Sequence, residues 1–431
     1  MYQSNLDEVS SFSITETILT VKIVSITGGI KMKENKVPSI LLIMFLVVFP
    51  QTSETIFTPA LSDISNALHV SINTSQLTLS IYFVGFALGV FFWGWLSDRI
   101  GRRPAMLWGV LIYGIGSLLC YLTNSIELLL FSRFIQAFGA STGSVIVQTM
   151  IRESMDGNKR HVVFAKISAV IAFAPALGPL IGSWLNHILG FRSVFFSLIL
   201  LSIGIFAYTF MALPETRVIS AMNQKINIFS VFTRMIKNPK VLTFGLLIGG
   251  TNGILFSYYG EAPSVFMDYF KMSPGLFGFL GIIVSLSFLL GATTSNRLLP
   301  IFKSEKIINI GCLIMTIGAI VLLITTLIGT QPTLFYAVSM LIAIFILFLG
   351  IGVALPNCIS LALVDFQDVI GTAGSVFGLG YYLVVTFIMW GMSQVHTGSL
   401  VVMPIYFLVL SIIMTMMCRI FIYTPNVEKT A

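Results

Sequence analysis

The feature that most constrains this chain is a series of apolar runs that recur from residue 38 almost to the end. A helix of about 20 apolar residues crosses the hydrocarbon core of a bilayer, where every backbone polar group must be paired within the segment. Each run therefore predicts a membrane-spanning helix. We expect about twelve spans by hydropathy, near residues 38–58, 76–96, 104–122, 127–150, 163–187, 192–212, 241–262, 275–294, 306–328, 333–356, 371–392 and 401–422.

The composition excludes a soluble protein. Of the 431 residues, 56% are hydrophobic and 10% are charged, whereas soluble domains carry about a quarter charged residues. The net charge of +7 does not predict a nucleic-acid partner, because the basic residues gather in short loops between the spans. The cysteines fall in separate spans without a CxxC pair, so we expect buried, reduced thiols and no metal site: Cys120, Cys312, Cys358 and Cys418.

The basic residues also predict the orientation of the chain. Short loops rich in Lys and Arg stay on the cytoplasmic side of a membrane. The loops after the even-numbered spans are basic, whereas the opposite loops contribute only Arg192 and Lys271. We therefore expect both termini in the cytoplasm. The basic residues of the cytoplasmic loops are Arg99, Arg102, Arg103, Arg152, Lys159, Arg160, Arg217, Lys225, Arg234, Lys237, Lys240, Lys303 and Lys306.

A short polar stretch between the second and third spans carries a family signature. Residues 94–104, here called the signature loop, read Gly-Trp-Leu-Ser-Asp-Arg-Ile-Gly-Arg-Arg-Pro. This stretch resembles the loop motif of the major facilitator superfamily at all of its defining positions. We expect Asp98 and Arg102 to act in conformational change rather than catalysis. A carboxylate at a helix end can form charge-assisted hydrogen bonds to the other half in one state and lose them in the other. The motif residues are Gly94, Asp98, Arg99, Gly101, Arg102 and Arg103.

The resemblance, together with a faint internal repeat, predicts the architecture. The pattern Gly94-x-x-x-Asp98-Arg99 returns as Gly291-x-x-x-Ser295-Asn296-Arg297 in the second half. Such a repeat implies an all-α integral membrane protein with two pseudo-symmetric six-helix bundles around a central cavity. We expect a disordered cytoplasmic tail over 1–36, or an upstream mis-start with Met32 as the true start. The bundles are expected over 37–213 and 241–431, joined by a cytoplasmic linker over 214–240.

Three ionisable residues inside predicted spans are candidates for proton coupling: Glu54, Arg133 and Glu261. A charge in a bilayer is costly, so each is a functional candidate by default. At 1.5 Å per residue, Glu54 and Arg133 lie at a similar height above the cytoplasm, which allows them to face each other. The alternative for each of the three is a side chain that reaches water near the membrane surface.

Two of these residues lie in segments that resemble the corresponding segments of drug:proton antiporters. Arg133 falls in Leu129-x-x-x-Arg133-x-x-Gln136-x-x-Gly139, which resembles the family's fourth-span motif and implies a role in proton transfer. Glu54 precedes a Pro-Ala-Leu segment, as in the bicyclomycin/chloramphenicol-resistance exporters. A carboxylate in a partly dry cavity exchanges protons near neutral pH. Competition between a proton and a substrate for Glu54 would produce antiport.

The fifth predicted span holds a pattern that is similar to the family's antiporter motif. Its small residues predict close packing of a neighbouring helix, and its two prolines predict a bend. The alternative is ordinary packing of small residues in a membrane. The residues concerned are Pro175, Gly178, Pro179 and Gly182.

Candidates for lining a substrate cavity are polar and aromatic side chains within the spans, where aromatic faces suit lipophilic cations. The alternative for the tyrosines is a position at the membrane interface or facing lipid. The histidines lie in or near loops, and we assign them no role: His69, His161, His187 and His396. The cavity candidates are Tyr82, Gln136, Gln148, Tyr258, Tyr259 and Tyr381.

The resemblance implies a secondary active exporter of small amphipathic or cationic molecules in the cytoplasmic membrane of a bacterium. We expect it to be driven by the proton gradient without a cofactor, to have the lipid bilayer as its partner, and to be a monomer. The alternatives are a proton-coupled importer of a small metabolite and a non-transport membrane receptor. An enzyme is not expected, because the loops are too short to hold a catalytic site.

Overall fold

A computed structural model describes residues 37–155, 163, 176–217, 228–329 and 331–423, and all regular structure in these ranges is helical. The first half contains the following helices, in addition to a helix over residues 176–189: α2 (Ile40–Thr55), η1 (Thr58–Ala60), α3 (Leu61–Ala67), α4 (Ile72–Ile100), α5 (Arg102–Leu122), α6 (Ile126–Ala140), α7 (Thr142–Ser154) and α9 (Phe191–Ala212). The second half contains α10 (Ile228–Ile236), α11 (Pro239–Ala262), η2 (Pro263–Tyr269), α12 (Pro274–Leu298), α13 (Ser304–Ile328), α14 (Leu334–Leu361), η3 (Val364–Val369), α15 (Ile370–Val395) and α16 (Val402–Phe421).

The predicted membrane spans are confirmed within the described ranges. Eleven helical segments are long and apolar enough to cross a bilayer, and they coincide with eleven of the twelve predicted spans. The other span, predicted over 163–187, is described only in part, and its residues 176–189 are helical. We call this segment the fifth-span helix.

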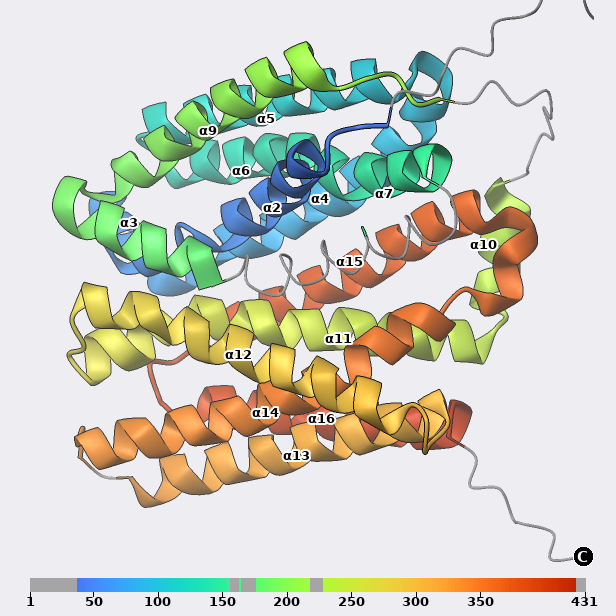
Figure 1. Ribbon diagram of the computed structural model, residues 1–431. Helices are drawn as coiled ribbons and strands as arrows, with labels where there is room; N and C mark the ends of the chain where they lie inside the picture. Colours follow the sequence, from blue (N-terminus) through green and yellow to red (C-terminus); the bar gives the residue numbers. More distant parts are fainter. Residues whose placement is uncertain (1–36, 156–162, 164–175, 218–227, 330, 424–431) are drawn as a thin grey trace, which may run out of the picture. The chain divides into compact units, whose positions relative to one another are not determined.

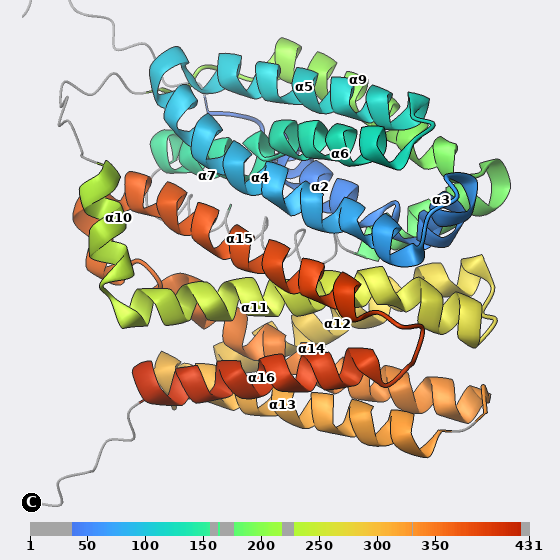
Figure 2. The same cartoon turned by 180° about the vertical axis from the view of Figure 1, so that it is seen from behind.

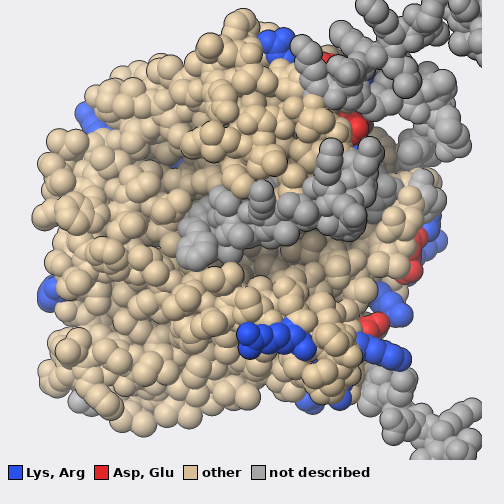
Figure 3. Space-filling model, viewed as in Figure 1, with Lys and Arg blue, Asp and Glu red and all other residues tan. Residues whose placement is uncertain are grey.

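The surface of the molecule suits a lipid environment. Large apolar side chains are exposed on most spans, among them Leu111, Ile203 and Phe387. Figure 3 shows a broad face almost free of charge, with the charged side chains gathered mostly toward the edge where α7 and α10 lie in Figure 1. This uneven distribution of charge is the pattern that the basic loops predict for a cytoplasmic side.

Several boundaries differ from the predictions, and the signature loop differs most. α4 continues to Ile100 and α5 begins at Arg102, so the reversal is made at Gly101 alone. Gly101 has a φ of 101°, a conformation that is costly for residues with a Cβ. Asp98, Arg99 and Arg102 therefore lie on helix ends, where their side chains have fixed directions.

Three further segments extend or interrupt the predicted spans. The first span is broken after Thr55 and continues through η1 and α3, because Pro59 cannot continue a regular α-helical ladder. The seventh span continues past Pro263 as a π-helix, η2. The predicted linker over 214–240 contains the helix α10.

The two halves of the described chain repeat the same packing scheme (Figure 1). In the first half α5 packs against α6 and α9, and in the second half α13 packs against α14 and α16. Equivalent glycines allow the close approach: Gly109 and Gly116 of α5 lie against α7 and α6, and Gly311 and Gly318 of α13 lie against α14. The repeat that the sequence shows only faintly is therefore present in the helix contacts.

The halves meet along α4 and α15, which run side by side in both views (Figures 1 and 2). A Cβ on Gly94 would lie 3.0 Å from Oγ of Ser375, so this glycine of the signature loop faces the other half. Aromatic rings fill the middle of the contact. Phe86 lies 4.8 Å from Tyr382, centroid to centroid, and Phe83 lies 4.5 Å from Phe256 of α11.

Candidate functional site

The break in the first span positions Glu54. This residue is one place from the end of α2 and lies near the middle of the 28-residue segment Ile40–Ala67. Its side chain is buried, with 2% of the residue exposed. Its Oε2 atom has no hydrogen-bond partner among the described residues. A carboxylate group is therefore held in the interior with an unused bonding position.

Arg133 lies beside this group without an ion pair to it. Its Nη1 and Nη2 atoms donate to the carbonyl oxygen of Ser53 over 3.5 Å, and Nη1 also donates to Oε1 of Gln136. The guanidinium lies between two aromatic rings, 4.0 Å from the centroid of Phe57 and 4.2 Å from that of Tyr82. Arg133 is fully buried. Its charge is thus stabilised by π faces and a carbonyl oxygen, which leaves the Glu54 carboxylate free to bind something else.

The polar side chains around Arg133 form one buried cluster within the first half. Gln136 donates from Nε2 to Oγ of Ser117 over 2.8 Å. The hydroxyls of Ser53 and Tyr113 share a short hydrogen bond. We call the following group the Arg133 cluster: Ser53, Glu54, Tyr113, Ser117, Arg133 and Gln136.

The cavity candidates are distributed over three environments. Gln136 belongs to the Arg133 cluster, whereas Gln148 is exposed on α7. Tyr82 covers Arg133, and Glu54 is close enough to interact electrostatically with Tyr82 and with Tyr381 of the second half. The structure therefore places side chains of both halves within electrostatic range of Glu54.

Tyr258 and Tyr259 lie on α11, inside the second half. The ring of Tyr258 contacts that of Phe348 of α14, with 5.3 Å between centroids, and it also contacts Tyr259. Both tyrosines are buried, and the hydroxyl of Tyr259 has no partner among the described residues. The structure does not bring them into contact with the Arg133 cluster.

The fifth-span helix lies directly against the break in the first span. A Cβ on Gly178 would overlap the side chain of Thr55, and one on Gly182 would overlap the carbonyl oxygen of Ile56. Pro179 is buried in the same helix, and Pro175 lies outside the described residues. Gly178 and Gly182 therefore pack closely against the two residues that follow Glu54.

The opposite face of the fifth-span helix contacts the second half. A Cβ on Gly278 of α12 would lie 3.0 Å from Cα of Leu180, and one on Gly281 would lie 2.9 Å from Cα of Ala176. Ser183 also donates a short hydrogen bond to the carbonyl oxygen of Pro274. This helix therefore separates the Glu54 region from α12 and touches both.

Arg102 is the centre of a charged network at the other end of the first half. Its Nη1 atom lies 2.6 Å from Oδ1 of Asp98 and donates to Oγ of Ser97. Its Nη2 and Nε atoms bind the carboxylate of Glu153 on α7, over 2.6 and 3.0 Å. Asp98 is thus bonded within its own half. Its predicted bond to the other half remains a prediction.

Glu215, just beyond α9, completes this network. Its carboxylate accepts from the backbone N–H groups of Arg102 and Arg103, over 2.8 and 3.1 Å, and so caps the first turn of α5. It also lies where a side chain on Gly101 would stand. The signature loop therefore needs a glycine at this position for two reasons, its φ angle and this close contact.

The other arginines of the signature loop make local contacts. Arg99 lies 4.0 Å above the ring centroid of Trp95. Arg103 donates to the carbonyl oxygen of Phe210 over 2.7 Å. The contact of Arg103 with Phe210 fixes the loop against the end of α9.

Glu261 lies at the opposite end, away from the Arg133 cluster. It is 4% exposed and pairs with His396, the residue that follows α15. Four residues in these networks have no role predicted from the sequence: Gln76, Glu153, Glu215 and His396. Gln76 can be recognised in the sequence as an uncharged polar residue within an apolar span. For the other three, the neighbouring residues do not indicate which groups they contact.

Comparison with known proteins agrees with this architecture. A model described as Major Facilitator Superfamily matches residues 43–389. An "Uncharacterized transporter" of Rickettsia bellii is 33% identical over 382 residues, which are 88% of this chain and 94% of the relative. A "Chloramphenicol resistance protein" of Pseudomonas aeruginosa is 30% identical over 74% of this chain and 75% of its own length.

More distant relatives agree. A "Multidrug resistance protein D" of Escherichia coli is 26% identical over 80% of this chain and 86% of the relative. The crystal structure of a D-xylose-proton symporter superposes with a TM-score of 0.75 over 89% of this chain and 97% of its own, at 14% identity, which indicates a shared fold. This chain is a multi-pass membrane transporter that belongs to the major facilitator superfamily.

Proposed function

We propose that this transporter exports small amphipathic or cationic molecules from a bacterial cell in exchange for protons. The observation that carries the proposal is the state of Glu54, a buried carboxylate at mid-span with an unused Oε2 atom. A carboxylate in such a place binds either a proton or a cationic group. Binding of one excludes the other, and this competition produces antiport when the site is exposed alternately to the two sides of the membrane.

The surroundings of Glu54 suit this exchange. Arg133 is held by Ser53 and two aromatic rings rather than by Glu54, so it contributes a nearby positive charge without occupying the carboxylate. That charge favours release of the proton once the site opens to a solution of lower proton concentration. Tyr381 of the second half adds an aromatic side chain, of the kind that attracts lipophilic cations, within electrostatic range of Glu54.

Named relatives support the direction of transport. Two of them are called a chloramphenicol resistance protein and a multidrug resistance protein, names that describe those proteins. The end that carries Arg102 has the excess of basic residues, so we place it, and both termini, in the cytoplasm. The membrane would then be the cytoplasmic membrane of a bacterium, and two six-helix halves over 37–213 and 241–431 would alternate access to Glu54.

Everted membrane vesicles with an acidic interior test this proposal, with ethidium and chloramphenicol as probes. An exporter that exchanges protons accumulates the probe inside and raises the internal pH when the probe is added. A proton-coupled importer would instead expel a preloaded probe under the same gradient. Accumulation that is unchanged after the gradient is collapsed with a protonophore would contradict antiport.

A further inference from the structure

A second buried acid lies at the opposite end of the molecule from Arg102, paired with a histidine. Nδ1 of His396 lies 2.8 Å from Oε2 and 3.0 Å from Oε1 of Glu261. The side chains are 8% and 6% exposed, respectively. Such a partner stabilises the ionised form of a buried carboxylate, because an isolated charge in the interior is costly.

Two amide side chains of α4 hold this pair from the other half of the protein. Nε2 of Gln76 donates to Oε1 of Glu261 over 2.8 Å. Nδ2 of Asn73 donates to the carbonyl oxygens of Ser393 and His396, over 2.8 and 2.9 Å, at the end of α15. Residues three apart lie on one face of a helix. We call Asn73, Gln76, Glu261 and His396 the outer latch, because they join α4 to α11 and α15.

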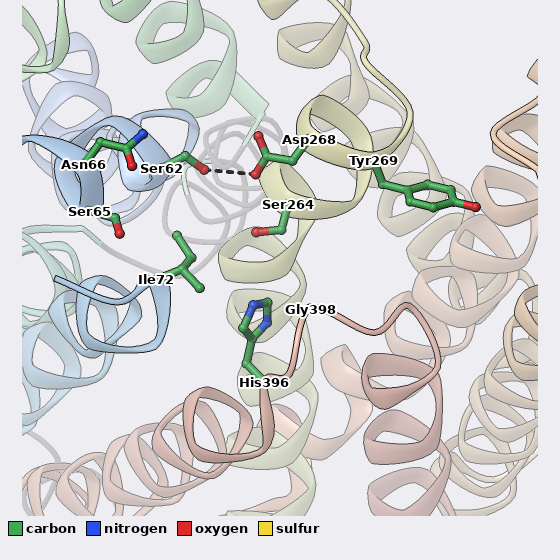
Figure 4. Close-up of a pocket in the computed structure, with 9 residues that line it drawn as sticks. All are labelled: Ser62, Ser65, Asn66, Ile72, Ser264, Asp268, Tyr269, His396 and Gly398. Atoms are coloured by element: carbon green, nitrogen blue, oxygen red, sulfur yellow. Dashed lines mark hydrogen bonds between the residues drawn. The ribbon is translucent and has the colours of Figure 1, made fainter. Parts of the chain in front are cut away.

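The outer latch borders a cavity of about 540 Å³ (Figure 4). The cavity lies between residues of the first half and residues of η2, and a hydrogen bond of 3.2 Å from Ser62 to Asp268 crosses it. His396 points into this space, so protons from the adjoining solution reach the imidazole. The lining residues are Ser62, Ser65, Asn66, Ile72, Ser264, Asp268, Tyr269, His396 and Gly398.

The position of His396 favours its charged form. It follows the C-terminus of α15, where the helix dipole stabilises a cation. The hydrogen bond to Glu261 raises the pKa of His396 above its ordinary value, and desolvation offsets this only in part. Among the described residues, the other titratable groups that face the pair or its cavity are Asp268 and Tyr269, since α4 contributes only amides here.

We propose that the Glu261–His396 pair is a second proton-binding site, open to the outer cavity, which holds the outer end closed while His396 carries its proton. The proposal rests on the orientation given under Proposed function. With a protonated imidazole, Glu261 is neutralised and also accepts from Gln76, so the halves are joined. When the imidazole loses its proton, the carboxylate is left buried beside a neutral ring, and the outer end opens more readily.

The sign of the pH dependence follows from the raised pKa of His396. The pair is complete below the ordinary pKa of histidine, about 6.5, and it is lost as the outer pH rises through the higher value. The latch is therefore strongest when the outer solution is acidic, which is the condition under which an uncontrolled proton leak would be greatest.

Thiol labelling from outside tests the proposal without any substrate. The reporter is Ser264→Cys, which lines the cavity, and its rate of reaction with a membrane-impermeant maleimide is measured in intact cells between pH 6 and 9. Gln331→Cys, an exposed position, corrects for the intrinsic pH dependence of the thiol. We expect the corrected rate to rise by about fivefold or more across this range, the lower end of ordinary coupling between sites.

Three variants in the Ser264→Cys background separate the latch from general effects. His396→Gln keeps a donor but cannot titrate, so its labelling rate should not change with pH. His187→Gln removes a different, exposed histidine and should behave like the parent. Gln76→Ala leaves the pair intact but removes the hydrogen bond through which the pair is joined to α4, so its labelling at acidic pH should be faster than that of the parent. A persisting pH dependence in His396→Gln, or parental labelling in Gln76→Ala, would overturn the proposal.

Discussion

Gly182 of the fifth-span helix lies so close to Ile56 that a Cβ atom would overlap the carbonyl oxygen of Ile56. This contact is two residues beyond Glu54. Substitution of Gly182 by Ala must therefore move either the fifth-span helix or the break in the first span. We expect Gly182→Ala to lower the melting temperature of the purified transporter and to abolish most probe transport in vesicles.

Gly204→Ala is the matched control for this substitution. Gly204 lies in α9, and a Cβ there would meet no atom of the described residues within 4 Å. Replacing a mid-helix glycine by alanine then stabilises a helix by roughly 0.5–1 kcal/mol. Equal melting temperatures for the two variants would show that the contact of Gly182 with Ile56 is not tight.

Glu54→Gln tests the role of the buried acid. The amide has nearly the same shape, so the transporter should still reach the membrane and remain folded. The glutamine amide cannot bind and release a proton near neutral pH. We therefore expect accumulation of ethidium in everted vesicles to fall to the level of membranes without the transporter. Glu127→Gln, which changes an exposed acid in the first turn of α6, should leave accumulation intact. Accumulation by Glu54→Gln at the parental rate would remove Glu54 from the mechanism.

Asp98→Asn and Glu153→Gln test whether a residue of the Arg102 network contributes to the transport rate or to the stability of the fold. The side chain of Asp98 is 68% exposed and that of Glu153 is 20% exposed. An exposed ion pair contributes about 1 kcal/mol or less, whereas hydrogen bonds to a charged group contribute about 1.5–3 kcal/mol. We therefore expect Asp98→Asn to slow transport with little change in melting temperature, and Glu153→Gln to lower the melting temperature clearly.

A binding measurement completes this comparison. Quenching of tryptophan fluorescence by ethidium should give the same dissociation constant for Asp98→Asn and the parent, because this aspartate is distant from the Arg133 cluster. A large loss of binding would contradict a purely conformational role for Asp98.

Glu215→Ala tests the cap of α5. The substitution leaves the N–H groups of Arg102 and Arg103 without their acceptor, and loss of an N-terminal cap costs about 0.5–2 kcal/mol. Glu305→Ala is the matched control, since Glu305 stands in the first turn of α13, the equivalent helix of the second half. We expect the melting temperature to fall more in Glu215→Ala than in Glu305→Ala. Equal losses would mean that only the general attraction of an acid to a helix N-terminus is at work.

The sequence predicts the helices of this protein well, because each membrane span is a long run of mostly apolar residues. It also marks Glu54, Arg133 and Glu261, since charges stand out in apolar runs. Their partners could not be predicted in the same way. Glu261 meets Gln76 across 185 positions of the chain, and Arg102 meets Glu153 across 51. The packing of the helices brings these partners together in space, and the sequence around each residue does not indicate its partner.

The turn at Gly101 shows a further limit of prediction. Glycine and charge at residues 94–104 indicate a short reversal, but the carboxylate that completes it comes from Glu215. The residues of the loop motif therefore do not include the acceptor that binds the N–H groups of Arg102 and Arg103. The same holds for His396, whose role depends on a glutamate that belongs to another helix.

The cap supplied by Glu215 has a consequence for biosynthesis. The carboxylate is translated 113 residues after Arg102, whose N–H it accepts. While the first spans leave the ribosome and enter the bilayer, the N-terminus of α5 must remain uncapped or bind water. Its final geometry is reached only after α9 has been inserted. The signature loop is therefore completed only when the first half has been inserted as far as Glu215.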